Sequence, residues 1–214
     1  MISARLRIIV SADAPDHELI GRAASLLGRG AIAAVPTDTL YGLAADPFSA
    51  TAVQRVFSIK DRAQERALPL VASNLQQVES RIGVLTPLAR RLAMCFWPGP
   101  LTLIVAAPAT IASEVIGTNA TVGVRVPAHA VTRALCEACG SPLTATSANI
   151  SGQPPSNDPD VIWQALGDRI DVLVDAGCTP GGPPSTIVDV TGDVPGLIRA
   201  GAISWDSVLA AIRA

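Results

Sequence analysis

Short apolar runs bounded by proline or glycine constrain the fold of this chain more than any other sequence feature. The clearest is the run at 31–35, which lies between Gly30 and Pro36 and predicts a buried strand. Pro36 has no N–H to donate to a neighbouring strand, so we expect the strand to end there. Further apolar runs predict strands at 6–10, 68–72, 101–106, 122–126, 143–145, 171–174 and 185–189.

Amphipathic segments with helix-start residues separate these runs, as in an α/β fold. Ser49, Asn74 and the Thr86-Pro87 pair each predict the start of a helix. One more helix is predicted to begin within 11–16 and to end near residue 27, and others are predicted over 131–138 and 160–166 and after Ser204. The sequence shows no internal repeat and no linker long enough to separate two domains. We therefore expect one domain over 1–214, with its core at about 15–205 and no carboxyl-terminal extension domain.

Composition indicates a globular domain with an aliphatic core, because 49% of the 214 residues are apolar and only 3% are aromatic. The net charge of −2 argues against a surface that binds nucleic-acid duplexes non-specifically. A local basic groove is still compatible with it. The uncharged stretch 92–113 is long enough to span a bilayer, but the prolines at 98, 100 and 108 interrupt it. With no secretory signal and only four cysteines, we expect a reduced cytoplasmic setting.

The loop after the run at 31–35 concentrates small polar groups. Thr37, Asp38, Thr39 and the Tyr41 hydroxyl follow one another, and Gly42 allows a close approach of backbone to a ligand. Such residues just past the carboxyl end of a strand lie where open α/β sheets bind ligands. A plain turn, in which the threonines and the aspartate bond to their own backbone, has the same composition. Both interpretations stay open from this loop alone.

Three cations, Lys60, Arg62 and Arg66, lie within seven residues, and Lys60 is the one lysine beside fifteen arginines. They suit a clamp for phosphates, because arginine offers a bidentate fork and lysine a point charge. A solvated loop in which Asp61 and Glu65 form local ion pairs is the alternative.

Two further arginines stand out. Arg125 lies in the middle of an apolar run, where a guanidinium is costly unless an anion partners it, and we favour a ligand over a structural ion pair. Arg199 lies beside the glycine at 201. Ser147 and Asn149 lie in the polar segment 146–152, which suits phosphate oxygens or a carboxylate and lacks the Gly-x-Ser-x-Gly pattern of a serine nucleophile.

Several common catalytic patterns are absent from the sequence. It has no Walker A loop and no Gly-x-Gly-x-x-Gly motif. His17 and His129 are the only histidines, so neither a histidine-based triad nor a histidine-rich metal site has support. One Cys-x-x-Cys pair, Cys136 and Cys139, falls late in a predicted helix, which disfavours a zinc or redox role. The Gly- and Pro-rich segment 176–184 leaves open whether it closes over a substrate.

Seven segments, in this order, resemble one family, the YrdC/TsaC family of L-threonylcarbamoyladenylate synthases. The resemblance covers roughly residues 15 to 205. Each motif alone is weak, but together they are specific. They are Pro-Thr-Asp-Thr-Leu-Tyr-Gly-Leu at 36–43, Lys-x-Arg at 60–62, Trp-Pro-Gly-Pro-Leu-Thr at 97–102, Arg-Val-Pro at 125–127, Ser-Ala-Asn-x-Ser-Gly at 147–152, Ser-Thr-Ile-Val-Asp at 185–189 and Arg-x-Gly at 199–201.

The resemblance implies a twisted, mixed α/β sheet of parallel and antiparallel strands, with flanking helices and a concave ligand groove. It implies a nucleotidyltransferase that makes threonylcarbamoyl-AMP and pyrophosphate from ATP, L-threonine and bicarbonate or carbon dioxide. The product would serve a partner complex that modifies adenosine in transfer RNA. Magnesium is expected with ATP, with no metal ligand from the protein and no membrane association, and a weak direct contact with tRNA is left open.

The resemblance also implies residue roles. Lys60 and Arg62 would be catalytic. ATP would be bound by Lys60, Arg62, Arg66, Ser147, Asn149 and Arg199. Threonine would be bound by Thr39, Arg125 and Ser185, with Arg125 on its carboxylate.

Two departures from the family pattern and two rival functions remain. The family often has Lys or Asn near position 66 and Pro after the last arginine, where this chain has Arg66 and Ala200. The resemblance therefore leaves the phosphate contact at position 66 open.

One rival function is a non-catalytic RNA-binding module that uses the same groove, which the acidic balance and scarce aromatics disfavour. The other is a carbamoyl-adenylate-forming relative that uses carbamoyl phosphate.

Overall fold

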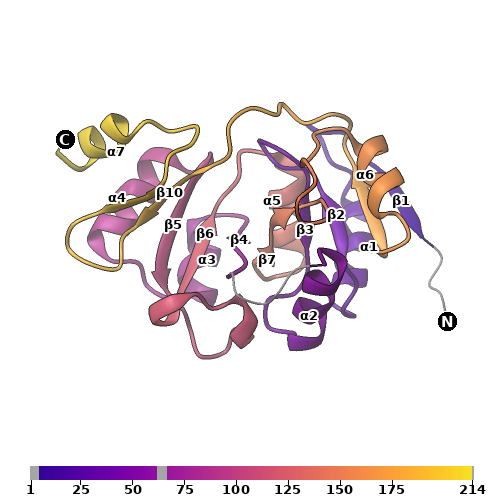
Figure 1. Ribbon diagram of the computed structural model, residues 1–214, viewed down its shortest axis with the longest axis horizontal. Coiled ribbons are helices and arrows are strands. Elements are labelled where there is room, and N and C mark those ends of the chain that lie inside the picture. Colours follow the sequence, from indigo (N-terminus) through magenta and orange to yellow (C-terminus); the bar gives the residue numbers. More distant parts are fainter. Residues whose placement is uncertain (1–4, 62–66, 214) are drawn as a thin grey trace.

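The strands form two sheets, one in each half of the molecule (Figure 1). The structure, a computed structural model, describes residues 5–61 and 67–213. Both sheets are mixed, and helices flank them, so the predicted α/β fold with parallel and antiparallel strands is confirmed. The strands are divided between two sheets and do not form one continuous sheet.

The five-stranded sheet has the order β1-β9-β2-β3-β8. Strands β1, β9 and β2 run parallel, and β3 and β8 extend the sheet in antiparallel pairs. Their bounds are β1 (Leu6–Ile9), β2 (Ala33–Val35), β3 (Gly42–Ala44), β8 (Thr146–Ser147) and β9 (Val172–Asp175). The 36–41 loop therefore joins β2 and β3, which are neighbouring strands of this sheet.

The six-stranded sheet has the order β11-β10-β5-β6-β4-β7. The pairs β10–β5 and β4–β6 are parallel, and the other pairs are antiparallel. The bounds are β4 (Leu70–Val71), β5 (Leu101–Ala106), β6 (Thr121–Arg125), β7 (Leu143–Thr144), β10 (Thr186–Asp189) and β11 (Gly196–Arg199). The predicted strands are confirmed to within about two residues, which is the usual uncertainty of element ends.

Helices begin where the sequence supplies capping side chains. The Oγ of Ser49 accepts a hydrogen bond from the amide of Ala52, Thr86 caps the helix that begins at Pro87, and Asn74 caps the next one upstream. The α-helices are α1 (His17–Leu27), α2 (Ala50–Ile59), α3 (Leu75–Arg81), α4 (Pro87–Phe96), α5 (Ala130–Ala138), α6 (Pro159–Leu166) and α7 (Trp205–Arg213). Two 3₁₀ turns, η1 (Ser113–Val115) and η2 (Thr118–Ala120), precede β6.

Helices cover both faces of the five-stranded sheet. Helices α1 and α5 pack on the face that carries Val35 and Val174, and α2 and α6 pack on the face that carries Leu43 and Leu173. On α5 the buried stripe includes Cys136, whereas Ala138 is exposed. Cys136 donates its thiol to the carbonyl of Val71, and its burial raises the pKa of that thiol.

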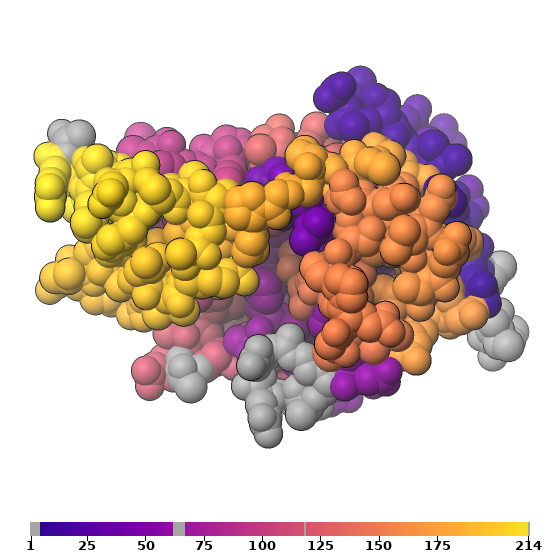
Figure 2. Space-filling view, turned by 45° about the horizontal axis from the view of Figure 1, so that its top comes forward, coloured from indigo at the N-terminus to yellow at the C-terminus, as the bar shows by residue number. Residues whose placement is uncertain are grey.

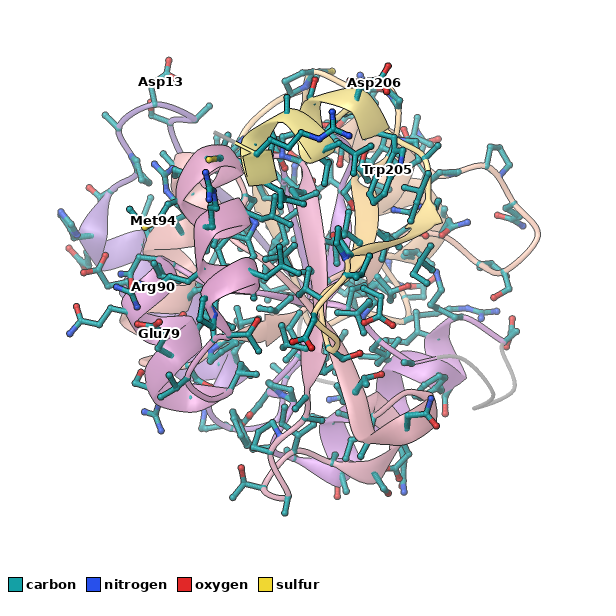
Figure 3. All side chains as sticks on the ribbon, turned by 90° about the vertical axis from the view of Figure 1, so that its left-hand side faces the viewer. Asp13, Glu79, Arg90, Met94, Trp205 and Asp206 are labelled. Atoms are coloured by element: carbon teal, nitrogen blue, oxygen red, sulfur yellow. The ribbon has the colours of Figure 1, made fainter. Side chains whose placement is uncertain are left out.

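Helices α3, α4 and α7 cover only one face of the six-stranded sheet. In β5, Leu101, Leu103 and Val105 are buried toward these helices, and the alternate residues turn to the opposite face. Two of these helices are linked by an ion pair, which joins the Arg90 side chain on α4 to Glu79 on α3 (Figure 3). On the opposite face α5 packs against Val71, and the rest of that face forms one wall of a cleft.

Among the described helices, none has the length and apolar character needed to cross a membrane.

Candidate active site

A cleft of about 460 Å³ lies between the two sheets. In the space-filling view it appears as a hollow between the yellow carboxyl-terminal part and the orange part of the chain (Figure 2). One wall comes from the 37–42 loop and from residues 145–147, and the other from β4, β5, β6, β10 and β11. The polar side chains among the lining residues are Thr37, Thr39, Tyr41, Thr102, Arg125, Thr146, Ser147, Ser185 and Arg199.

Five of the seven predicted site residues that the structure describes line this cleft. They are Thr39, Arg125, Ser147, Ser185 and Arg199. The other two, Lys60 and Asn149, are not among the lining residues but form hydrogen bonds with Ser147. Arg62 and Arg66 fall outside the described residues. Side chains far apart in the sequence are thus brought together at one place.

The 36–41 loop forms a turn that is stabilised by its own side chains, and it also faces the cleft. Thr37 donates its hydroxyl to the carbonyl of Leu40 at 2.7 Å and lies 3.1 Å from the Thr39 hydroxyl, so part of the loop stabilises its own turn. Both threonines nevertheless line the cleft. The Tyr41 hydroxyl, expected among the ligand-binding groups, instead donates to the carbonyl of Gly177 at 2.8 Å, and burial raises its pKa. Tyr41 is 1% exposed because its side chain packs in the core. Its hydrogen bond to Gly177 therefore fixes the start of the segment 176–184.

The segment 176–184, called here the crossing loop, runs from β9 in one sheet to β10 in the other above the cleft (Figures 1 and 2). The carbonyl oxygen of Thr39 accepts two hydrogen bonds from it, from the Thr179 hydroxyl and the Gly181 amide, each at 2.8 Å. Gly181 has φ of +72°, which favours glycine at that position. The crossing loop is therefore tied to the same loop that presents Thr39 to the cleft.

Arg125, at the end of β6, is only 8% exposed and does have an anionic partner inside the protein. Its Nη1 donates to Oδ1 of Asp38 at 2.7 Å, and the other carboxylate oxygen accepts from the amide of Ala128 at 3.2 Å. Burial lowers the pKa of the Arg125 guanidinium, Asp38 opposes this, and Arg199 adds to it. The structural ion pair is thus present, and Arg125 also faces the cleft.

On the same wall as Arg125, three side chains form a hydrogen-bonded row. Arg199 donates through Nε and Nη2 to the carbonyl of Ser185 and through Nη2 to the Ser185 hydroxyl, at 3.2, 2.8 and 3.1 Å. The Ser185 hydroxyl in turn lies 2.8 Å from that of Thr102. Sequence reasoning gave Thr102 no role, although a polar residue between Leu101 and Leu103 in a buried strand was a usable signal.

Lys60 is 3% exposed and lies at the C-cap of α2. Its ammonium donates to the carbonyl oxygens of Ser147 and Asn149, at 2.7 and 3.0 Å, and to Oδ1 of Asn149 at 2.9 Å. Oδ1 also accepts from the Ser147 hydroxyl at 2.6 Å. The lysine and the polar segment are thus in direct contact, and these hydrogen bonds fix the conformation of the segment.

Among the described residues that line the cleft there are cations and hydroxyls and no carboxylate. Within residues 5–61 and 67–213, no three His, Cys, Asp or Glu side chains cluster in a way that could hold a metal ion. This set of donors fits an anionic ligand.

Comparison with known proteins gives the same family as these motifs. A family model described as telomere recombination (Sua5, YciO, YrdC) matches residues 25–201. A putative threonylcarbamoyl-AMP synthase of Mycobacterium tuberculosis is 35% identical over 179 residues, which cover 84% of this chain and 82% of the relative. The threonylcarbamoyl-AMP synthase of Pyrococcus abyssi is 34% identical over 87% of this chain, and the match spans only 55% of that longer protein.

Solved structures agree in fold. The crystal structure of P. abyssi Sua5 complexed with L-threonine matches with a TM-score of 0.90 at 32% identity, covering 97% of this chain and 61% of Sua5. The structure of Escherichia coli YciO matches with a TM-score of 0.85 at 25% identity, covering 94% and 98% of the two chains. With a family model that matches most of its length and relatives above 30% identity, this chain belongs to the Sua5/YciO/YrdC family.

Proposed function

We propose that this protein is an L-threonylcarbamoyl-AMP synthase, a nucleotidyltransferase that converts ATP, L-threonine and bicarbonate or carbon dioxide into threonylcarbamoyl-AMP and pyrophosphate. The observation that carries the proposal is the single cleft that gathers Arg125, Ser147, Ser185 and Arg199 from both sheets. The names of the M. tuberculosis and P. abyssi relatives support the same activity.

Threonine binds, in this proposal, between Thr39, Arg125 and Ser185. Arg125 takes the carboxylate, because a buried guanidinium forms strong, directed hydrogen bonds with a carboxylate. The complex of P. abyssi Sua5 with L-threonine supports an amino-acid subsite in this fold. ATP binds through Lys60, Arg62, Arg66, Ser147, Asn149 and Arg199.

The reaction needs no nucleophile from the protein. The amine of threonine adds to carbon dioxide, forming an N–C bond and releasing a proton to give a carbamate. A carbamate oxygen then attacks the α-phosphorus, and the bond from phosphorus to the pyrophosphate oxygen breaks. Both steps depend on positioning and on neutralising phosphate charge, which hydroxyls and guanidiniums in one cleft supply.

Magnesium enters this scheme with ATP as part of the substrate. The described lining residues include no carboxylate, and in this proposal phosphate oxygens and water bind the ion. The product is a reactive mixed anhydride, and we propose that a tRNA-modifying transferase complex consumes it.

The test is incubation of the purified chain with MgATP, threonine and ¹³C-bicarbonate, followed by mass spectrometry. The expected product is the threonylcarbamoyl adenylate carrying the label, together with pyrophosphate, and it should disappear when threonine or ATP is omitted. Formation of an adenylate from carbamoyl phosphate without threonine would contradict the proposal, as would the absence of pyrophosphate under all these conditions.

A further inference from the structure

Thr102 and Ser185 come from neighbouring parallel strands and meet at the cleft wall. Thr102 lies in β5 and Ser185 immediately precedes β10, and their hydroxyl oxygens are 2.8 Å apart. Thr102 is 4% exposed, yet both residues line the cleft. Neither hydroxyl is needed to close the sheet, because the amide of Thr186 already bonds to the carbonyl of Pro100 at 3.0 Å.

A hydrogen-bond count shows what this pair can offer to a ligand. Each hydroxyl has one proton and two acceptor lone pairs. The Ser185 oxygen accepts from Nη2 of Arg199, which cannot accept in return. The pair therefore contains two hydroxyl protons, of which one is used in the bond between Thr102 and Ser185.

The second proton has no protein acceptor among the residues that the structure describes, whichever hydroxyl carries it. It is available toward the cleft, next to the Arg199 guanidinium, and Arg125 lines the same cleft. One free hydroxyl donor in a cleft with two cations matches an acceptor oxygen on an anion.

We propose that Thr102 is a positioning residue for the amino-acid subsite: it fixes the Ser185 hydroxyl so that the pair presents one proton to the carboxylate of threonine. This rests on the proposed function, in which Ser185 contacts threonine. The contact with Arg199 holds the backbone and oxygen of Ser185, and Thr102 restricts the remaining rotation of its hydroxyl. Loss of Thr102 therefore weakens threonine binding without removing Ser185 itself.

The experiment compares Thr102→Val, which keeps the shape and removes the hydroxyl, with Thr102→Ser, which keeps the hydroxyl. We expect Thr102→Val to raise the KM for threonine by about tenfold, the upper value for one neutral hydrogen bond, with little change in kcat or in the KM for ATP. Thr102→Ser should stay within about twofold of the wild type.

The matched control is Thr144→Val. Thr144 is fully buried, and its hydroxyl also joins two segments, accepting from the amide of Ala45 at 2.9 Å and donating to the carbonyl of Leu43 at 3.2 Å. It does not line the cleft. We expect this variant to lose thermal stability and to keep the wild-type KM for threonine.

A double-mutant cycle tests whether Thr102 acts through Ser185. In a Ser185→Ala background, Thr102→Val should cause no further rise in the KM for threonine. Additive effects, an unchanged KM in Thr102→Val, or a rise in the KM for ATP alone would each overturn the inference. If the wild type neither binds threonine in calorimetry nor makes the adenylate, the proposed function itself fails, which is a separate outcome.

Discussion

Arg125 donates a hydrogen bond to Asp38 at 2.7 Å, so the guanidinium that faces the cleft is already held by a carboxylate from the opposite wall. One N–H is used in this pair, and arginine has five. The ion pair thus orients the guanidinium and leaves donors for a substrate carboxylate.

Replacing Arg125 with alanine should raise the KM for threonine by about 30-fold or more, because truncating one partner of a buried charged pair costs about 2–5 kcal/mol. Steady-state pyrophosphate release at varied threonine and ATP measures it. The matched control is Arg55→Ala, since Arg55 also pairs with an aspartate, Asp171, at 2.8 Å but lies outside the cleft. An unaltered KM for threonine in Arg125→Ala would refute the assignment.

Lys60→Met should reduce pyrophosphate release by about 100-fold, the effect of losing one preorganised charged donor. The same change frees the segment 146–152, because the ammonium is bonded to Ser147 and to Asn149. Hydrogen exchange of that segment should therefore become faster. Lys60→Arg is not expected to restore activity, since a planar fork does not fit a site built around a compact ammonium.

Ser58→Ala provides the control for Lys60, because Ser58 lies on the same helix and its hydroxyl donates locally, to the carbonyl of Gln54. Full activity in Lys60→Met would count against the site assignment. Loss of activity with unchanged exchange at 146–152 would show that Lys60 acts on the nucleotide alone.

Arg62→Ala is likewise predicted to abolish turnover and leave the fold intact.

Gly201→Ala should disrupt the wall that carries Ser185. A Cβ at position 201 would lie 2.6 Å from the backbone nitrogen of Thr186, and neighbouring atoms of the chain leave no room for it. Because backbone must shift, we expect a loss of about 2 kcal/mol in unfolding free energy and a raised KM for threonine. Gly192→Ala is the control, as nothing lies within 4 Å of its added Cβ. Equal stability and kinetics in both variants would contradict this explanation.

Local sequence signals predicted the elements well, because their causes lie within a few residues. Ser49, Thr86 and Asn74 cap helices as expected, and β5 has the bounds that its apolar run predicts. The site was harder to predict. Thr102 and Ser185 are 83 residues apart, and only the pairing of β5 with β10 brings them together.

Side-chain direction was the other limit. Tyr41 lies in the motif with Thr39, but its hydroxyl bonds to Gly177, which is 136 residues further along the chain. The anionic partner of Arg125 in the structure is the carboxylate of Asp38. No local sequence pattern indicates this pair, because the two residues are 87 positions apart. Five of the residues that the family resemblance named line one cleft, whereas their hydrogen-bond partners required the structure.

We expect His129 to make the stability of the chain fall in mild acid. Its Nδ1 is buried and has no hydrogen-bond partner among the described residues, and burial lowers its pKa from the ordinary 6.5, against the attraction of Asp38 and Asp13. The unfolded chain thus binds a proton more readily, and stability falls as the pH drops below about 6.5. His129→Ser should flatten this dependence in urea unfolding between pH 5.5 and 7.5. The serine should also add about 1 kcal/mol by capping α5, which lacks a side-chain cap. Parallel curves for the two proteins would show that His129 is not the responsible group.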